Sequence, residues 1–308
     1  MALYTVVFIV LVKEQNKFHS SFFSIFIANF FLNLLTYLNS FVTLRFPQRT
    51  QENGLFASFF ESYGPDNYKD RFFPLSFFHL LHYHFAYCQY LCNLLQSFNR
   101  ATAVFLPSTY TNFWNKYIVP SLIFVFVSPL IVTLRIFLND SFYVFTGTNF
   151  VIQSTVGRAY IYATLMPFIL FFMLITVVVS TWTLFKLVKM NLRGKKISDL
   201  SLFVVTYAVI LIEVFASVLV LFNFFIALSG STNETLVRIQ GIVNYLTPFS
   251  SDALTLSHPW FMIISNTKIR KSIISLVKCQ STTSTETINF KRTSDIKTGV
   301  RASTEFLK

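Results

Sequence analysis

Six long apolar blocks decide what this chain can fold into. They cover approximately residues 22–44, 72–96, 117–137, 160–187, 200–227 and 243–264. Each block is long enough to cross the hydrocarbon core of a bilayer, which takes about 20 mostly apolar residues. Because hydrocarbon offers no water to the backbone amides, a spanning block has to be a helix. The sequence therefore predicts an all-α membrane protein.

A shorter apolar block, residues 2–12, precedes these six and cannot cross a bilayer on its own. We expect the first helix to be short or truncated at its N-terminus, which gives a bundle of seven transmembrane helices. One alternative is that this block is not a span, so that six helices remain. The other is a signal peptide, but the basic n-region and small-residue cleavage site of such a peptide are missing.

The composition agrees with a membrane protein. Hydrophobic residues make up 54% of the chain and charged residues 12%, against about 25% charged residues in ordinary soluble domains. A soluble enzyme of this length has no core that hides so much apolar surface, and a disordered chain has few aromatic residues. No P-loop, HExxH or GxSxG motif is present, so the sequence predicts neither an enzyme nor a cofactor.

Lysine and arginine residues predict the orientation of the helices. Of these cations, 13 fall in the loops and early tail on one side of the bundle, and 7, including Arg45, fall in loops on the other side. The side with more cations is expected to be cytosolic, which with seven helices puts the N-terminus outside. The cations lie between apolar blocks rather than on a soluble module, so the net charge of +12 predicts contact with lipid and no nucleic acid. Two N-glycosylation sequons, at Asn139 and Asn233, fall in loops assigned to the outside.

The chain divides into three predicted parts. These are a seven-helix transmembrane domain over residues 1–267, an amphipathic juxtamembrane helix over 268–279 and a disordered Ser/Thr-rich cytosolic tail over 280–308. In the second part the apolar residues fall on one helical face, which is typical of a helix lying along the inner leaflet. Cys279 is either a palmitoylation site or a free thiol.

Polar residues recur at helical spacing inside three of the apolar blocks. Steps of three, four or seven residues place each set on one face of its helix. The sets are Asn29, Asn33, Thr36 and Ser40; His82, Gln89, Asn93, Gln96 and Arg100; and Asn244, Thr247, Ser251, Thr255 and His258. Either they hold the helices together by hydrogen bonds, or they line a polar interior that houses a ligand or a switch.

Two acidic residues, Glu213 and Asp252, lie within the predicted spans. A lone carboxylate in hydrocarbon needs a partner, a water-filled cavity or a proton. For Asp252 we favour a polar network, because His258 lies on a nearby turn. For Glu213 a polar network and a protonated structural acid are both open.

Histidine and aromatic residues crowd the predicted outer end of the third span. This combination suits an amphipathic organic molecule, although aromatic residues on a membrane helix also serve packing. His79 and His82 lie one turn apart, but no carboxylate or cysteine completes a metal site with them, so no metal is predicted. The candidate ligand-binding residues are His79, His82, Tyr83, Tyr87, Gln89 and Asn244.

Two segments carry a resemblance to a known family. The first is Leu-Leu-Gln-Ser-Phe-Asn-Arg at 94–100, followed by Ala-Val-Phe-Leu-Pro at 103–107 and then Phe113-Trp114. The second is Ser-Asp-Ala-Leu-Thr-Leu-Ser-His-Pro-Trp at 251–260. Over about residues 20–271 the chain resembles the nematode serpentine chemoreceptors, most closely their class gamma (Srg) family.

The resemblance implies a G-protein-coupled receptor that detects a small-molecule cue at the plasma membrane of sensory neurons, with a heterotrimeric G protein as its cytosolic partner. Asn99 and Arg100 would then form the cytosolic arginine motif, with Arg100 touching the sixth helix or the G protein. The alternative is that Arg100 only anchors a helix end by snorkelling. Asp252 and Pro259, with His258 nearby, would belong to a switch in the seventh helix. The outer loops contain no cysteine, so no disulfide ties the third helix to the second outer loop.

Two other functions stay open at this stage. A transporter or ligand-gated channel would use Glu213 and Asp252 on an ion path, although the sequence shows no inverted repeat and no paired broken helices. A scaffold with no ligand of its own is the remaining hypothesis.

Overall fold

The computed structural model describes residues 2–13, 21–67, 74–192, 200–229, 234–265 and 269–275. Most of these residues lie in helices, which confirms the predicted all-α fold. The long elements are α2 (Ser21–Ser40), α5 (Leu75–Phe105), α6 (Tyr110–Val127), α8 (Arg158–Leu192), α9 (Leu200–Ser229) and α10 (Glu234–Ser265). The shorter ones are α1 (Ala2–Lys13), η2 (Phe41–Arg45), α3 (Phe46–Arg49), α4 (Ala57–Ser62), α7 (Leu130–Phe137), β1 (Ser141–Phe145) and β2 (Phe150–Ser154).

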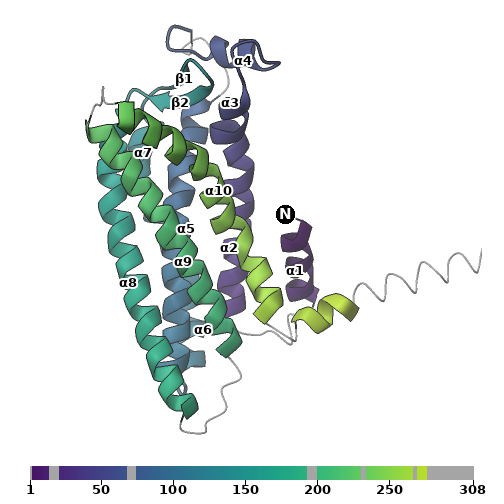
Figure 1. The fold of residues 1–308 in the computed structure, drawn as a ribbon. Coiled ribbons are helices and arrows are strands. Elements are labelled where there is room, and N and C mark those ends of the chain that lie inside the picture. Colours follow the sequence, from purple (N-terminus) through teal and green to yellow (C-terminus); the bar gives the residue numbers. More distant parts are fainter. Residues whose placement is uncertain are drawn as a thin grey trace, which may run out of the picture.

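The long helices run side by side as one bundle with α5 at its centre (Figure 1). α5 packs against α2, α6, α7, α8 and α9, while α10 packs against α9, α2 and α1. By length and composition, four described helical segments are apolar enough to cross a membrane. They are Ser21–Arg49, Tyr110–Phe137, Arg158–Met190 and Tyr207–Ile226. α5 and α10 are also long but are not among these four segments, and each carries one of the predicted polar stripes.

The polar stripes face the interior of the bundle, as their spacing predicts. Asn29 and Asn33 of α2, and Asn93 and Gln96 of α5, are all buried. The outer surface is apolar, and Phe171 of α8, for example, is 59% exposed. A polar interior with an apolar exterior is the arrangement expected of a helix bundle in lipid.

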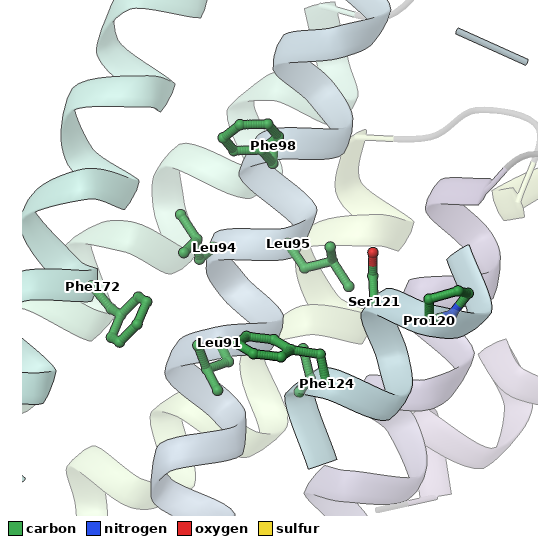
Figure 2. Close-up of a pocket in the computed structure, with 9 residues that line it drawn as sticks. Leu91, Leu94, Leu95, Phe98, Pro120, Ser121, Phe124 and Phe172 are labelled. Carbon is green, nitrogen blue, oxygen red and sulfur yellow. The ribbon is translucent and has the colours of Figure 1, made fainter. Parts of the chain in front are cut away.

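An apolar groove interrupts this exterior where α5 lies between α6 and α8. It has a volume of about 360 Å³ (Figure 2). Its walls come from these three helices, and its lining residues are Leu91, Leu94, Leu95, Phe98, Pro120, Ser121, Phe124, Val125 and Phe172.

A short π-helical turn, η2, joins α2 to α3 in one continuous helix. The Phe46 amide donates to the Phe41 carbonyl, five residues back, instead of the usual four. Pro47 follows directly in α3. A proline ring clashes with the carbonyl four residues before it, and a π-turn is one way to relieve such a clash. The turn widens the helix next to Arg45.

The end of the bundle that carries α3 and α4, called here the outer end, is covered by a β-hairpin that the sequence did not reveal. β1 pairs antiparallel with β2, with Tyr143 opposite Ile152, and Gly147 takes the positive φ of 90° that the turn needs. The Tyr143 amide donates to the Tyr63 carbonyl (2.9 Å), and its hydroxyl donates to the Val42 carbonyl (2.9 Å).

Aromatic packing fixes this hairpin without a disulfide. The Tyr143 ring lies 4.8 Å from the ring of Phe60 in an edge-on contact, and Phe150 lies 5.4 Å from Phe60. Tyr143 is only 1% exposed, and this burial raises the pKa of its phenol. The sequence predicted that no disulfide holds the second outer loop. This buried aromatic cluster holds the loop in place.

The N-terminal helix and the segment after α10 meet at the other, inner end. α1 is 12 residues long, which agrees with the predicted short first helix. Residues 269–275 are helical, and Ile269 is fully buried in a cluster with Val7, Phe22 and Phe26. The predicted tail and Cys279 lie outside the described residues.

Candidate functional site

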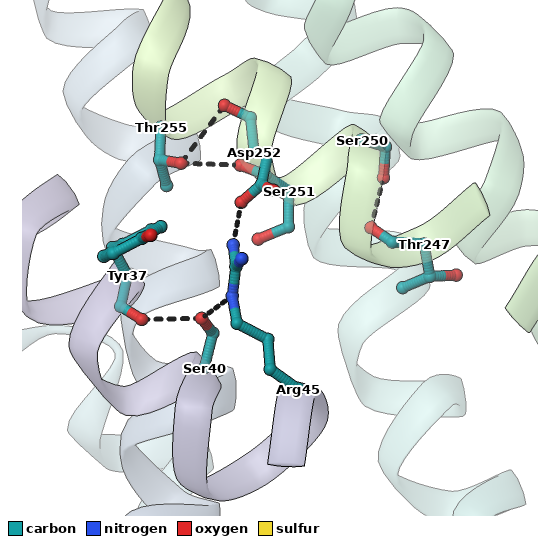
Figure 3. A network of polar contacts seen from close by, with 8 residues as sticks. All are labelled: Tyr37, Ser40, Arg45, Thr247, Ser250, Ser251, Asp252 and Thr255. Atoms are coloured by element: carbon teal, nitrogen blue, oxygen red, sulfur yellow. Dashed lines mark hydrogen bonds and ion pairs between the residues drawn. The ribbon is translucent and has the colours of Figure 1, made fainter. Parts of the chain in front are cut away.

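An ion pair joins α2 to α10 through the π-turn (Figure 3). The Arg45 guanidinium donates through Nη2 to Oδ1 of Asp252. Its Nε donates to the Ser40 hydroxyl at 2.8 Å, and the Ser40 hydroxyl donates to the Tyr37 carbonyl at 2.6 Å. The guanidinium carbon lies 4.6 Å from the centre of the Tyr37 ring, within reach of a cation–π contact.

Arg45 corrects one sequence assignment and adds a residue to the candidate site that the sequence reasoning missed. It was counted as an outer-loop cation, but it lies in η2 and turns toward α10. The side chains of Arg45 and Asp252 are only 22% and 30% exposed, so the two charges are largely shielded from solvent. The sequence signal that could have indicated this role of Arg45 is Pro47, which follows it by two residues at the end of the span. The predicted network at Asp252 thus exists with Arg45 as its partner, and the His258 side chain lies outside the described residues.

Three hydrogen bonds link α5 to its neighbours across the interior. Gln89 donates to the Asn33 carbonyl oxygen of α2 at 2.8 Å. The Ser180 hydroxyl of α8 donates to Ser97 at 3.0 Å. A third bond, of 2.9 Å, joins the Tyr90 hydroxyl to Ser217 of α9. The bond of Gln89 agrees with the interpretation of the polar stripe on α5 as an interhelical hydrogen-bonding surface, whereas Tyr90 and Ser97 were not part of that stripe.

Glu213 lies in the same interior layer and is 1% exposed. Both of its carboxyl oxygens are buried without a hydrogen-bond partner among the described residues, although the Asn93 side chain lies beside them. Its backbone carbonyl accepts a bond from the Ser217 hydroxyl at 2.8 Å. Burying an ionised carboxylate without a partner costs free energy. Glu213 is therefore, after Asp252, another unusual acidic group inside the bundle.

A closed ring of three hydrogen bonds surrounds Asn99 at the inner end. The Asn99 amide donates to Ser21 (2.7 Å), and the Tyr110 hydroxyl donates to the Asn99 carbonyl oxygen (3.1 Å). Ser21 and Tyr110 are themselves 2.7 Å apart, which leaves the serine hydroxyl as the donor of the third bond. One asparagine therefore ties α5 to the first residues of both α2 and α6.

Arg100, the next residue, is 7% exposed. Its guanidinium carbon lies 3.8 Å from the centre of the Phe22 ring of α2, which is the geometry of a cation–π contact. The sequence predicted a contact of Arg100 with the sixth helix or a G protein. In this structure the arginine packs on Phe22 of α2.

The predicted ligand-binding residues fall into two groups. His79 bonds through Nδ1 to Ser141 of the hairpin at 2.9 Å, and Nδ1 of His82 lies 3.3 Å from the Thr43 hydroxyl. Gln89 bonds to α2, as described above. Tyr83 and Tyr87 instead line a recess against α7 and α8 with a volume of only about 10 Å³. The Asn244 side chain lies outside the described residues.

Other predicted sites are only partly described. The Asn139 amide donates to the Arg135 carbonyl at 2.7 Å, and the second sequon, at Asn233, lies outside the described residues. Pro259 lies inside α10 and is buried. Within the described ranges, no three His, Cys, Asp or Glu side chains come together in a way that holds a metal ion.

Comparison with known proteins identifies relatives over nearly the whole chain. A family model described as Srg family chemoreceptor matches residues 1–273. Serpentine receptor class gamma-31 of Caenorhabditis elegans is 25% identical, and the match covers 89% of this chain and 87% of that receptor. Serpentine receptor class gamma-13 of the same organism is 24% identical, with 93% of this chain and 82% of that receptor covered.

Proposed function

The chain belongs to the Srg family of chemoreceptors, and on that premise we propose that it detects a small-molecule cue and passes the signal to a heterotrimeric G protein. The family consists of seven-transmembrane serpentine receptors and not of enzymes, which confirms the predicted family and the absence of enzymatic activity. The chain is accordingly a multi-pass membrane protein. We further propose the plasma membrane of a sensory neuron as its location, with glycans at Asn139 and Asn233.

The observation that carries G-protein coupling is the polar cluster of Asn99 and Arg100 at the inner end of α5. Positive charge predominates at this end, which is expected to be cytosolic. Arg100 is stacked on Phe22 (3.8 Å) and only 7% exposed, so little of its guanidinium is accessible to a cytosolic protein. We therefore interpret the structure as a resting state, in which activation frees Arg100 for its partner.

Ligand binding belongs at the opposite end of the bundle, near Tyr83 and Tyr87. The recess beside these tyrosines holds about 10 Å³, whereas pockets for organic ligands measure about 300–1,000 Å³. An agonist would have to open this region by moving α7 and α8 away from α5. A ligand shifts the receptor toward the active state only to the extent that it binds that state better.

The Arg45–Asp252 pair is the element that we propose as the switch between these ends. It bridges α2 and α10, two helices that also meet at the inner end. Displacement of α10 during activation would separate the two charges. Asp252 and Pro259 thus keep the switch role that the resemblance implies, with Arg45 added as the partner.

The test is a ligand screen in a heterologous cell with a second-messenger readout. We expect the receptor to give a ligand-evoked signal that Arg100→Ala abolishes. Arg49→Ala, at the exposed end of α3, is the matched control and keeps the signal. A C-terminal epitope verifies equal expression of all variants.

The competing function is transport. Asp252 and Glu213 were its candidate residues, but they belong to different contact networks in the described part of the chain. Substrate-driven flux in proteoliposomes that lack any G protein, together with an unchanged signal in Arg100→Ala, would overturn the proposal.

A further inference from the structure

The apolar groove on the outside of the bundle has no role in the receptor function proposed above. α6 and α8 both pack on α5 but scarcely on each other, so they leave a strip of α5 open between them. Figure 2 shows Leu91, Leu94 and Phe98 of this strip in the gap between Phe172 of α8 and Phe124 of α6. Its volume of about 360 Å³ lies within the range of pockets that hold organic ligands.

The lining of the groove suits a hydrocarbon chain. Eight of its nine residues are apolar, and the exception is Ser121. Phe98 and Phe124 are 48% and 60% exposed, so the groove opens sideways on a surface that faces lipid. Pro120 at its inner end has no amide hydrogen and interrupts the helical bonding of α6.

Two lysines lie beyond the groove toward the inner end, one on α6 and one on α8. Lys116 precedes Pro120 and Phe124 at steps of four residues, so all three lie on one face of α6. On the other side, Nζ of Lys186 lies 4.0 Å from the ring centre of Phe105. Phe105 follows Phe98 by two helical turns on the same face of α5.

Among the described residues, neither lysine has an acidic partner that would neutralise its charge. Within the described ranges, Lys116 and Lys186 contact the aromatic rings of Tyr117 and Phe105. Lys116 is exposed. An apolar groove with one cation beyond its inner end on each of the helices α6 and α8 matches a molecule with an apolar chain and an anionic head.

We propose that this groove binds an anionic phospholipid of the cytosolic leaflet. One acyl chain lies along Leu91, Leu94 and Phe98, and the headgroup phosphate lies between Lys116 and Lys186. The predicted orientation puts the two lysines at the cytosolic surface, where anionic phospholipids concentrate. A sterol or a neutral lipid would fill the slot but would leave the two cations unused. The proposal is independent of the ligand and of the G protein.

The experiment measures bound lipid by native mass spectrometry of the full-length receptor. The receptor is purified from nanodiscs that contain equal amounts of phosphatidylserine and phosphatidylcholine. We expect phosphatidylserine to be retained about 30-fold over phosphatidylcholine, because only the anionic headgroup uses the two lysines. Because a basic residue near the membrane surface changes binding by about fivefold, the double variant Lys116→Gln/Lys186→Gln should weaken phosphatidylserine retention by about 30-fold.

Two further variants separate the headgroup from the chain. Lys13→Gln/Lys271→Gln removes the same charge from exposed positions on α1 and on the helix at 269–275, and it should retain phosphatidylserine as the unaltered receptor does. Ser121→Trp fills the groove at a half-buried position and should abolish retention while the melting temperature stays within a few degrees.

Three results would overturn the proposal. One is equal retention of the two lipids by the unaltered receptor, which would indicate a neutral occupant. Another is an equal loss in both lysine double variants, which would indicate general surface attraction. The third is undiminished retention in a folded Ser121→Trp receptor, which would place the lipid elsewhere.

Discussion

Separating Arg45 from Asp252 should destabilise the bundle and raise its basal signal. Their side chains are 22% and 30% exposed, so the pair lies between a surface and a buried ion pair. Two unit charges about 4 Å apart attract by about 4 kcal/mol at an effective dielectric constant of about 20. Desolvation offsets most of that attraction, and polar contacts between membrane helices yield at most about 1.7 kcal/mol. We therefore expect a coupling of about 1–2 kcal/mol.

The assay is a double-mutant cycle with Arg45→Gln and Asp252→Asn, in which the free energy of unfolding is measured in mixed micelles. Asp252→Asn alone should be the milder change, because Arg45 keeps its contacts with Ser40 and Tyr37. The same variants should raise ligand-independent signalling, since the pair holds α2 against α10 at rest.

The matched control combines Asp252→Asn with Arg49→Gln, because Arg49 lies one turn further along and is exposed. Its effects should be additive within about 0.5 kcal/mol, as for independent sites. A coupling between Arg45 and Asp252 that also falls below about 0.3 kcal/mol would refute the reasoning. Charge reversal gives a second check, since Arg45→Asp with Asp252→Arg should recover stability that each single reversal loses.

Other contacts give further expectations. Glu213→Gln should raise the melting temperature by a few degrees, because the amide keeps the shape and cannot carry a buried charge; a lower melting temperature would mean that the charge is used. Tyr110→Phe removes two bonds of the ring around Asn99 and should cost about 1–3 kcal/mol in the free energy of unfolding, whereas Tyr117→Phe, at an exposed position on the same helix, should cost nothing measurable. Tyr143→Phe should increase amide hydrogen exchange in β1 and β2, with unchanged exchange contradicting the role of its hydroxyl. Burial raises the pKa of Tyr143 in the folded protein. The free energy of unfolding should therefore be constant below pH about 10, where the phenol of the unfolded chain starts to ionise, and should fall above that pH. That fall should be smaller in Tyr143→Phe.

The spans could be predicted because their signal is local. Any block of about 20 apolar residues has to satisfy its own backbone in lipid, so the ends of α8 and α9 lie within a few residues of the predicted blocks. The polar stripes were equally readable, because a helix has a fixed period. Thus Gln89 and Asn33, predicted to face inward, do so and bond to each other.

What the sequence could not reveal depends on contacts between distant segments. Arg45 and Asp252 are 207 residues apart, and no local pattern selects one arginine as the partner of that acid. The hairpin at 141–154 also lacked a signal, because its strands are short and stabilised by Phe60 and Tyr63 from another loop. His79 was predicted to bind a ligand because no sequence pattern indicates that Ser141 lies next to it in the fold.

The π-turn at Phe41–Arg45 makes the outer cap and the ion pair parts of one mechanical element. Its Val42 carbonyl accepts the hydrogen bond from Tyr143 of the hairpin, and its Arg45 side chain reaches Asp252. If the turn tightened to an ordinary α-helix, the segments on either side of it would rotate relative to each other by about 100°, the angle that one residue occupies in an α-helix. Such a rotation would not leave both contacts in place. Release of the hairpin and release of α10 would therefore both follow from one change, the conversion of the π-turn to an α-helix. Because that change moves the helix by a whole residue, it would be discrete and not a gradual bend.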